Sequence, residues 1–172
     1  MIKSKQKMLI AAAVLSFSAA AAIALLSNRS KPKLRLDDYT IPTEYKNWQR
    51  KLAYSPIPHL VLSHQNKSKV RYIFNSADCG IVKHGYKNRV EIFVIFNQNG
   101  NIEQVTLGKN IETPGIIAKM KKQNFFQQWN GGNKYIEPEH VTGATMTGKA
   151  VSENLAALMR ILVRENFFHP DR

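Results

Sequence analysis

Residues 89–107 read RVEIFVIFNQNGNIEQVTL and indicate the sheet around which this chain is built. Apolar side chains stand at every second position from Val90 to Phe96, which places them on one face of a strand over 89–96. The turn 97–101 contains an Asn-Gly pair, which tolerates positive φ and suits a connection to a second strand over 102–107. The stretch therefore predicts an antiparallel hairpin.

Segments on either side of the hairpin supply the other predicted elements. Residues 70–74 have the pattern of a further strand, and the amphipathic patch 43–54, TEYKNWQRKLAY, indicates a short helix. The turn 113–115, Thr-Pro-Gly, leads into a short helix over 116–122 with a basic C-terminal end. A long C-terminal helix over 147–166 is predicted from apolar residues spaced along one face: Val151, Leu155, Leu158, Met159 and Leu162. The expected fold class is α+β, a small antiparallel sheet packed with helices.

The composition limits the chemistry that this chain can perform. With 172 residues and 44% hydrophobic content, the chain supports one packed domain besides its N-terminal stretch. The single cysteine, Cys79, excludes a disulfide framework and any multi-cysteine metal site, and the five histidines show no ligand spacing. We therefore predict no metal site, and no residue is assigned a catalytic role because the chain has neither a nicotinamide fingerprint nor a general acid–base pair.

The N-terminal stretch has the pattern of a membrane segment. Residues 8–26, MLIAAAVLSFSAAAAIALL, are uncharged and about as long as the roughly 20 residues that a helix needs to cross a bilayer. Lysines at positions 3, 5 and 7 favour a cytoplasmic N-terminus, which places the body outside the cytoplasm, on the periplasmic side of the plasma membrane. A cleaved signal with small residues around 20–24 is the alternative, and it exports the body equally.

The predicted organisation thus has three parts. Residues 1–27 form a membrane anchor or signal, residues 28–40 a basic linker, and residues 41–172 the extracytoplasmic domain. The formal net charge of +13 is concentrated near the N-terminus, where seven basic and no acidic residues occur up to Arg35. Anionic lipid headgroups are the expected partner of this basic strip. Nucleic-acid binding is disfavoured because the body lacks a dense basic-aromatic patch.

A hydroxyl-rich turn precedes the long C-terminal helix. Residues 139–147 read EHVTGATMT, and the N-terminus of a helix attracts phosphate through its free N–H groups and dipole. Gly143 allows close backbone approach, and Ala144 keeps the site uncrowded. An ordinary helix cap is the competing interpretation, with the hydroxyl of Thr142 or Thr145 accepting a backbone N–H.

Two motifs in this region resemble those of a known family. Glu139-x-x-Thr142-Gly143-Ala144-Thr145 resembles the acidic-x-x-Ser/Thr-Gly-Ala-Thr flavinylation signature of the FMN-binding domain family, whose members occur in the Rnf electron-transport complex and in the sodium-pumping NADH:quinone oxidoreductase. Glu112-Thr113-Pro114-Gly115-Ile116 is similar to the loop that precedes this signature in the family. A weaker match begins at Gly85-Tyr86, so the resemblance covers about 80–167.

The resemblance implies a phosphoester between FMN and the hydroxyl of Thr145. A separate, magnesium-dependent flavin transferase would take FMN from FAD and recognise Glu139 together with the following motif. The residues expected to contact the cofactor are Thr142, Gly143, Ala144, Thr145, Thr147 and Lys149, with Glu112, Thr113, Pro114 and Gly115 from the preceding loop. Phe125, Phe126 and Trp129 are candidate walls for the isoalloxazine, with simple core packing as the alternative.

The function implied is electron transfer by covalently bound FMN between an unidentified donor and acceptor, proteins or a quinone. Two alternatives are a reductase subunit that acts with a catalytic partner, and a non-redox binding module in which the motif is only a helix cap. The chain departs from the family pattern at Ile117, where a second glycine is common, and at Glu139, where aspartate is commoner. Because the chain has no nicotinamide fingerprint and no general acid–base pair, an electron carrier or an oxidoreductase subunit is expected rather than an independent enzyme.

Overall fold

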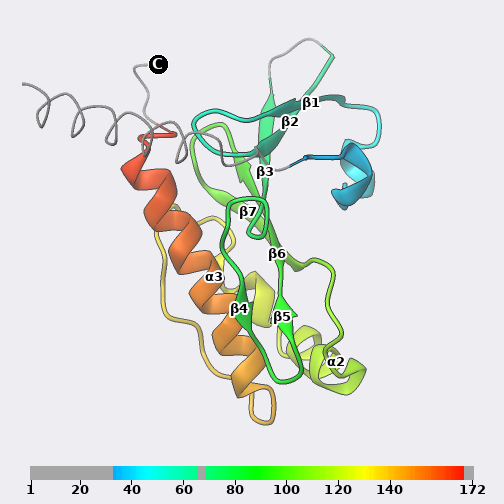
Figure 1. The fold of residues 1–172 in the computed structure, drawn as a ribbon, viewed down its shortest axis with the longest axis vertical. Helices are drawn as coiled ribbons and strands as arrows, with labels where there is room; N and C mark the ends of the chain where they lie inside the picture. The colour runs from blue at the N-terminus through cyan, green and yellow to red at the C-terminus, as the bar shows by residue number, and fades with distance from the viewer. Residues whose placement is uncertain (1–32, 66–68, 169–172) are drawn as a thin grey trace, which may run out of the picture. The chain divides into compact units, whose positions relative to one another are not determined.

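The computed structural model describes residues 33–65 and 69–168 (Figure 1). The segment predicted as an anchor or signal lies outside these residues, as do residues 28–32 of the predicted linker. Within the described ranges, no helix has the length and apolar character needed to cross a bilayer. One five-stranded antiparallel sheet has the order β1-β2-β3-β6-β7. Its strands are β1 (Gln49–Ala53), β2 (His59–Ser63), β3 (Val70–Asn75), β6 (Ile92–Asn97) and β7 (Ile102–Leu107).

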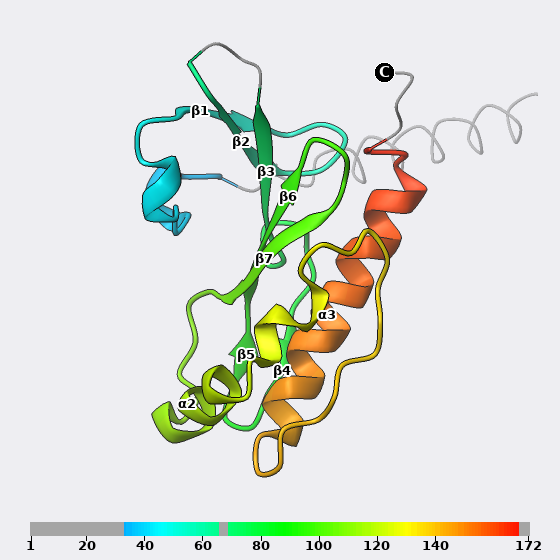
Figure 2. The same cartoon turned by 180° about the vertical axis from the view of Figure 1, so that it is seen from behind.

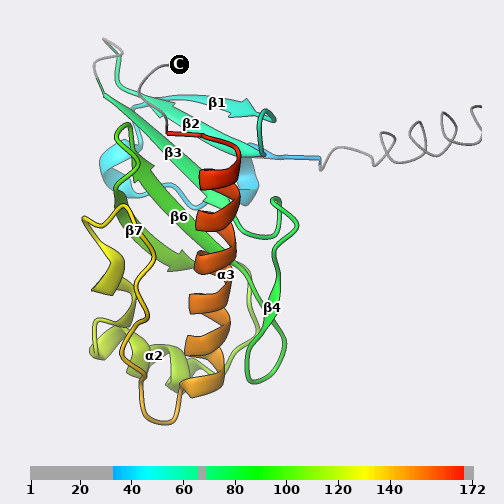
Figure 3. The same ribbon diagram turned by 90° about the vertical axis from the view of Figure 1, so that its left-hand side faces the viewer.

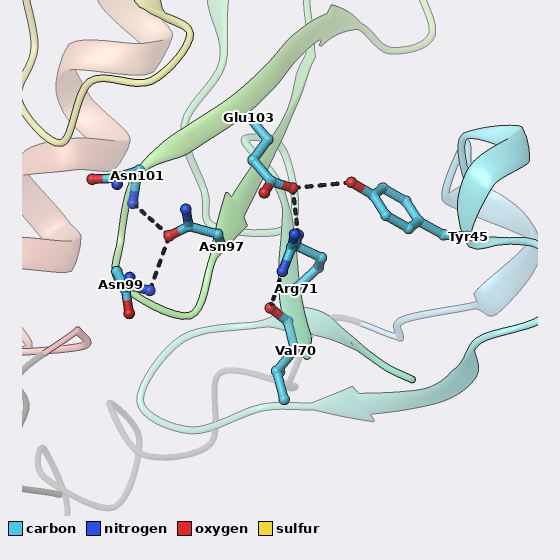
Figure 4. Close-up of polar contacts among 7 residues, drawn as sticks. All are labelled: Tyr45, Val70, Arg71, Asn97, Asn99, Asn101 and Glu103. Atoms are coloured by element: carbon cyan, nitrogen blue, oxygen red, sulfur yellow. Dashed lines mark hydrogen bonds and ion pairs between the residues drawn. The ribbon is translucent and has the colours of Figure 1, made fainter. Parts of the chain in front are cut away.

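The predicted hairpin is confirmed as β6 and β7, which pair with Val94 opposite Val105 and contain a bulge near Phe96. The side-chain carbonyl of Asn97 accepts the N–H groups of Asn99 and Asn101 at 2.9 and 3.0 Å, and these bonds close the turn (Figure 4). Gly100 has φ 80°, as the Asn-Gly pair predicted.

The predicted strand over 89–96 is divided in the structure. β5 (Arg89–Val90) pairs with β4 (Lys83–His84) in a separate two-stranded sheet, and β6 begins only at Ile92. The chain changes partner here because the N–H of Ile92 donates to the hydroxyl of Ser76 at 3.1 Å, and the carbonyl of Glu91 accepts from Gly108. The β4–β5 hairpin is thereby directed toward the N-terminal end of α3 (Figure 1).

Both faces of the sheet are covered. α3 (Thr145–Arg164) packs on one face, where Leu155 and Leu158 join Ile92 and Val94 in the main core (Figure 3). On the other face, Phe93 and Ile95 pack in a second core with residues of β2 and the N-terminal segment. The strict alternation in β6 therefore separates two buried faces rather than a buried and a solvated one.

The N-terminal part of the described chain forms this second layer. Two 3-10 turns, η1 (Leu36–Asp38) and η2 (Thr43–Tyr45), lead into β1, so the helix predicted over 43–54 is wrong. β1 forms a strand because β2 offers it a complete antiparallel partner. Leu34 and Tyr39 are buried, and the compact unit begins at Lys33, so residues 33–40 of the predicted linker belong to the folded unit.

A cluster of polar contacts among Tyr45, Arg71 and Glu103 connects this layer to the sheet. The hydroxyl of Tyr45 donates to the carboxylate of Glu103 at 2.9 Å, and the guanidinium of Arg71 forms an ion pair with the same carboxylate (Figure 4). Arg71 also lies 5.7 Å from the centre of the Trp48 ring. The cluster joins η2, β3 and β7 on the face of the sheet opposite to α3.

The remaining helices, α2 and η3, follow β7 in the chain. α2 (Pro114–Lys122) confirms the predicted short helix, although it begins at Pro114, a residue type that suits the first turn of a helix. η3 (Phe125–Trp129) follows, and an extended loop then runs along α3 back to its N-terminal end (Figure 2). The α+β class is confirmed, and this return loop brings the signature turn beside α2.

Candidate functional site

The N-terminus of α3 has no side-chain cap. Ala144 occupies the N-cap position, and no side chain there forms a capping hydrogen bond, so the interpretation of the motif as a hydroxyl cap is wrong. The N–H of Gly148 is the donor to the carbonyl of Ala144 at 2.8 Å. The N–H groups of the first helical residues precede that bond and therefore have no partner within the helix. Such N–H groups can donate hydrogen bonds to an anion.

The turn before the helix is tight and exposed. Gly143 has φ 77°, and the N–H of Ala144 donates to the carbonyl of Val141 at 2.9 Å. The side chains of Thr142 and Thr145 are exposed to solvent, which leaves both hydroxyls accessible. Glu139 is exposed as well.

A lysine that the motif does not include lies beside this turn. A Cβ placed on Gly143 would be 3.2 Å from Nζ of Lys119, which belongs to α2. Lys149, the cation predicted from the sequence, is exposed in the first turns of α3 and lies 3.9 Å from the carboxylate of Glu153. The ammonium of Lys119 thus provides positive charge beside Gly143, and the free N–H groups of α3 provide it at the start of the helix, where Thr145 lies.

Gly143→Ala is expected to lower the free energy of unfolding by about 1–2 kcal/mol, because a residue with a Cβ is strained at this positive φ. The added methyl group would also displace Lys119. Gly115→Ala is the matched control, since a Cβ there meets nothing within 4 Å. Urea denaturation of both variants tests this, and equal stabilities would contradict it.

Glu112 connects three segments around the turn. Its carboxylate accepts the backbone N–H groups of Tyr86, Lys87 and Asn88 at 3.3, 3.0 and 3.3 Å. It also accepts the hydroxyl of Thr147, in the first turn of α3. Burial raises the pKa of Glu112, but these four hydrogen bonds outweigh it and hold the pKa below the ordinary value.

The residues predicted to contact the cofactor divide into a buried pair, Glu112 and Thr147, and a group that is accessible to solvent. Thr147 is fully buried and its hydroxyl is bound to Glu112, so these two side chains hold the site together rather than face an exposed ligand. Thr113 is half-buried, and Pro114 and Gly115 are exposed at the start of α2.

The aromatic residues proposed as flavin walls belong largely to the core. Phe125 and Trp129 are buried, and the indole N–H of Trp129 donates to the carbonyl of Ile136 at 2.9 Å. Their burial favours the alternative interpretation, simple core packing, over a role as flavin walls. Phe126 borders a groove of about 570 Å³ together with Ile117 and Lys121. These two α2 residues lie two positions from Lys119, on the opposite side of the helix.

The clasp consists of the carboxylate of Glu112 and the four groups that donate hydrogen bonds to it. Three exposed apolar residues belong to this clasp or are adjacent to it in the sequence. Tyr86, Ile111 and Met146 are 61%, 64% and 57% exposed. Tyr86 is itself bonded to Glu112, Ile111 precedes Glu112, and Met146 precedes Thr147. This apolar triad was not predicted from the sequence, because its members come from three separate segments.

Other reactive residues do not form a second centre. Burial raises the pKa of the Cys79 thiol to about 12, so it is a poor nucleophile. Among residues 33–65 and 69–168, no group of three His, Cys, Asp or Glu side chains is placed to hold a metal ion.

The fold and site together define an α+β domain with an accessible threonine at an anion-accepting helix terminus. Residues 85–160 match the sequence model of the FMN-binding domain, so this segment of the chain is a domain of that family. The resemblance of the two motifs is thereby confirmed, and the domain is a flavin-binding one, which supports a role in electron transfer. No curated protein matches the chain.

The matched segment is only part of the folded unit. It begins at Gly85 and ends at Arg160 within α3, so it includes β6 and β7 but not β1, β2 and β3. The N-terminal layer and three of the five strands therefore extend the matched domain.

Proposed function

We propose that this protein carries FMN in a phosphoester bond to Thr145 and transfers electrons between a donor and an acceptor. The observation that supports the bond best is the exposed threonine at an uncapped helix N-terminus, with Lys119 beside the turn. Free N–H groups and a cation stabilise a phosphate at this position. The family match supports FMN as the group that bears the phosphate.

The attachment requires a partner enzyme. A flavin transferase with bound magnesium holds FAD, and Oγ of Thr145 bonds to the phosphorus on the FMN side of the pyrophosphate. The pyrophosphate bond breaks, AMP leaves with the bridging oxygen, and the hydroxyl proton passes to a base. The exposed residues Glu139, Thr142 and Gly143 are accessible for recognition by the transferase.

A covalent bond suits a protein outside the cytoplasm. The apolar run 8–26 and the preceding lysines support an anchored or exported location on the periplasmic side. Free FMN is dilute there, so a reversibly bound cofactor would be lost by mass action. FMN supplies one- or two-electron transfer when bound, whereas the chain orients the phosphate and provides the surface on which the ring rests.

The apolar triad is the proposed resting surface for the isoalloxazine. Replacing both Tyr86 and Met146 by serine is expected to expose the ring and to increase the quenching of flavin fluorescence by iodide. Val163→Ser is the matched control, because Val163 is also exposed but lies near the opposite end of α3. Equal quenching of the double variant and the wild type would argue against this surface.

The central test is the intact mass of the protein isolated from its own host. The expected mass exceeds that of the polypeptide by one FMN less one water, and the band fluoresces in a denaturing gel. An unmodified mass would reject the covalent bond. A flavin that is released on denaturation would support reversible binding instead.

A further inference from the structure

The carboxylate of Glu112 is buried without a compensating cation. Its side chain is 5% exposed, and within the described residues no lysine or arginine forms a salt bridge with it. An isolated buried charge is unfavourable unless hydrogen bonds replace its hydration. Here three consecutive N–H groups and one hydroxyl do so.

The close approach of the β4–β5 turn to Glu112 also depends on Gly85, which has no side chain. A Cβ on Gly85 would lie 2.8 Å from Oε1 of Glu112 and 2.7 Å from Val90, closer than real Cβ contacts. The N–H of Gly85 donates to the carbonyl of Asn88 at 2.8 Å and closes the turn whose N–H groups face the carboxylate. Gly85 therefore lets the β4–β5 turn approach Glu112.

Thr147 belongs both to the clasp around Glu112 and to the helical turn that contains Thr145, the proposed flavin acceptor. Thr147 is two residues after Thr145 in the first turn of α3, where the backbone is helical and fixes their relative placement. The hydrogen bonds of Glu112 go to Thr147 and to the β4–β5 turn rather than to Thr145 itself. Glu112, just before α2, thus binds both the β4–β5 turn and the first turn of α3. Through these bonds it fixes the start of α3, where Thr145 lies.

We infer that Glu112 is a positioning residue for flavin attachment, which acts through Thr147 to hold the acceptor turn in the form that the transferase modifies. This inference rests on the proposed attachment to Thr145. It differs from the expectation that Glu112 and Thr147 contact the cofactor, because both side chains are satisfied within the protein.

The test is the rate of FMN attachment by a flavin transferase, followed by intact mass with limiting enzyme. Thr147→Val removes one donor while keeping the shape, and Glu112→Gln removes the charge. Both should slow attachment about tenfold or more, the factor that a hydrogen bond to a charged group contributes. Thr147→Ser keeps the hydroxyl and should restore the rate to within about twofold of the wild type.

Glu103→Gln is the matched control, because Glu103 also accepts several bonds but lies in the cluster with Arg71 and Tyr45. Thermal denaturation of each variant identifies a temperature at which all variants are folded. Attachment to Thr147→Val at the wild-type rate, or an equal loss in Glu103→Gln, would overturn the inference. A wild-type protein that accepts no FMN would instead reject the proposed function, and this inference with it.

Discussion

Thr145→Ala protein is expected to acquire no covalent FMN in the presence of a flavin transferase, while it folds as the wild type does. The substitution removes the only oxygen that the proposed phosphoester uses. Its effect on stability should be within about 0.5 kcal/mol, because the side chain is exposed and forms no capping bond. Alanine is also a good helix former, which favours the first turn of α3. Intact mass and circular dichroism measure the two quantities.

Two variants make this result specific to one hydroxyl. Thr145→Ser keeps a hydroxyl at the same position and should still receive FMN. Thr142→Ala removes the neighbouring exposed hydroxyl and should change the rate of attachment but leave the final added mass intact. Retention of the FMN mass by Thr145→Ala would place the bond elsewhere and would contradict the proposal.

The elements that were predicted correctly are those whose signals are local. The β6–β7 hairpin depends on an Asn-Gly turn between apolar stretches, and α3 depends on the spacing of its own apolar residues. Both signals are contained in contiguous sequence, so no knowledge of distant partners is needed. The division of 89–96 into β5 and β6 is different, because Ser76 determines where the strand changes partner.

The error over residues 43–54 has the same origin. Their amphipathic pattern fits a short helix, but β2 pairs with Gln49–Ala53 and the sheet determines the outcome. The apolar ring of Tyr45 packs against Trp48 with centroids 5.0 Å apart, and its hydroxyl reaches Glu103. A strand of 5 residues with mostly exposed side chains has too weak a periodicity to be recognised without its partner.

The site was only partly predictable for a related reason. The signature turn is contiguous, and its sequence led directly to Thr145. The other features of the site combine residues from α2 and the loop before it, the β4–β5 hairpin and α3, which are distant in the sequence. These features are Lys119 beside the turn, the apolar triad and the clasp at Glu112. The sequence placed Glu112 and Thr147 at the site but could not show that they bind each other.

Trp129→Ala is expected to lower the free energy of unfolding by about 3–5 kcal/mol, the usual cost of removing a large buried aromatic side chain. Trp129 is nearly inaccessible, packs edge-on against Phe125 at 5.3 Å, and donates its indole N–H to Ile136. Trp129→Phe removes that donor and leaves the carbonyl of Ile136 without this bond, which should cost about 1 kcal/mol in addition to the smaller ring. Urea denaturation of unmodified protein measures these values.

Trp48→Ala is the comparison for this change, because Trp48 is only half-buried in the N-terminal layer and should cost less. The pair of variants also decides between the two roles considered for Trp129. A core residue affects stability whether or not FMN is present, whereas a flavin wall affects the absorption spectrum and fluorescence of the bound flavin. A small loss of stability in Trp129→Phe combined with a large spectral change would restore Trp129 to the flavin site, and would require the loop between η3 and α3 to open when FMN is attached.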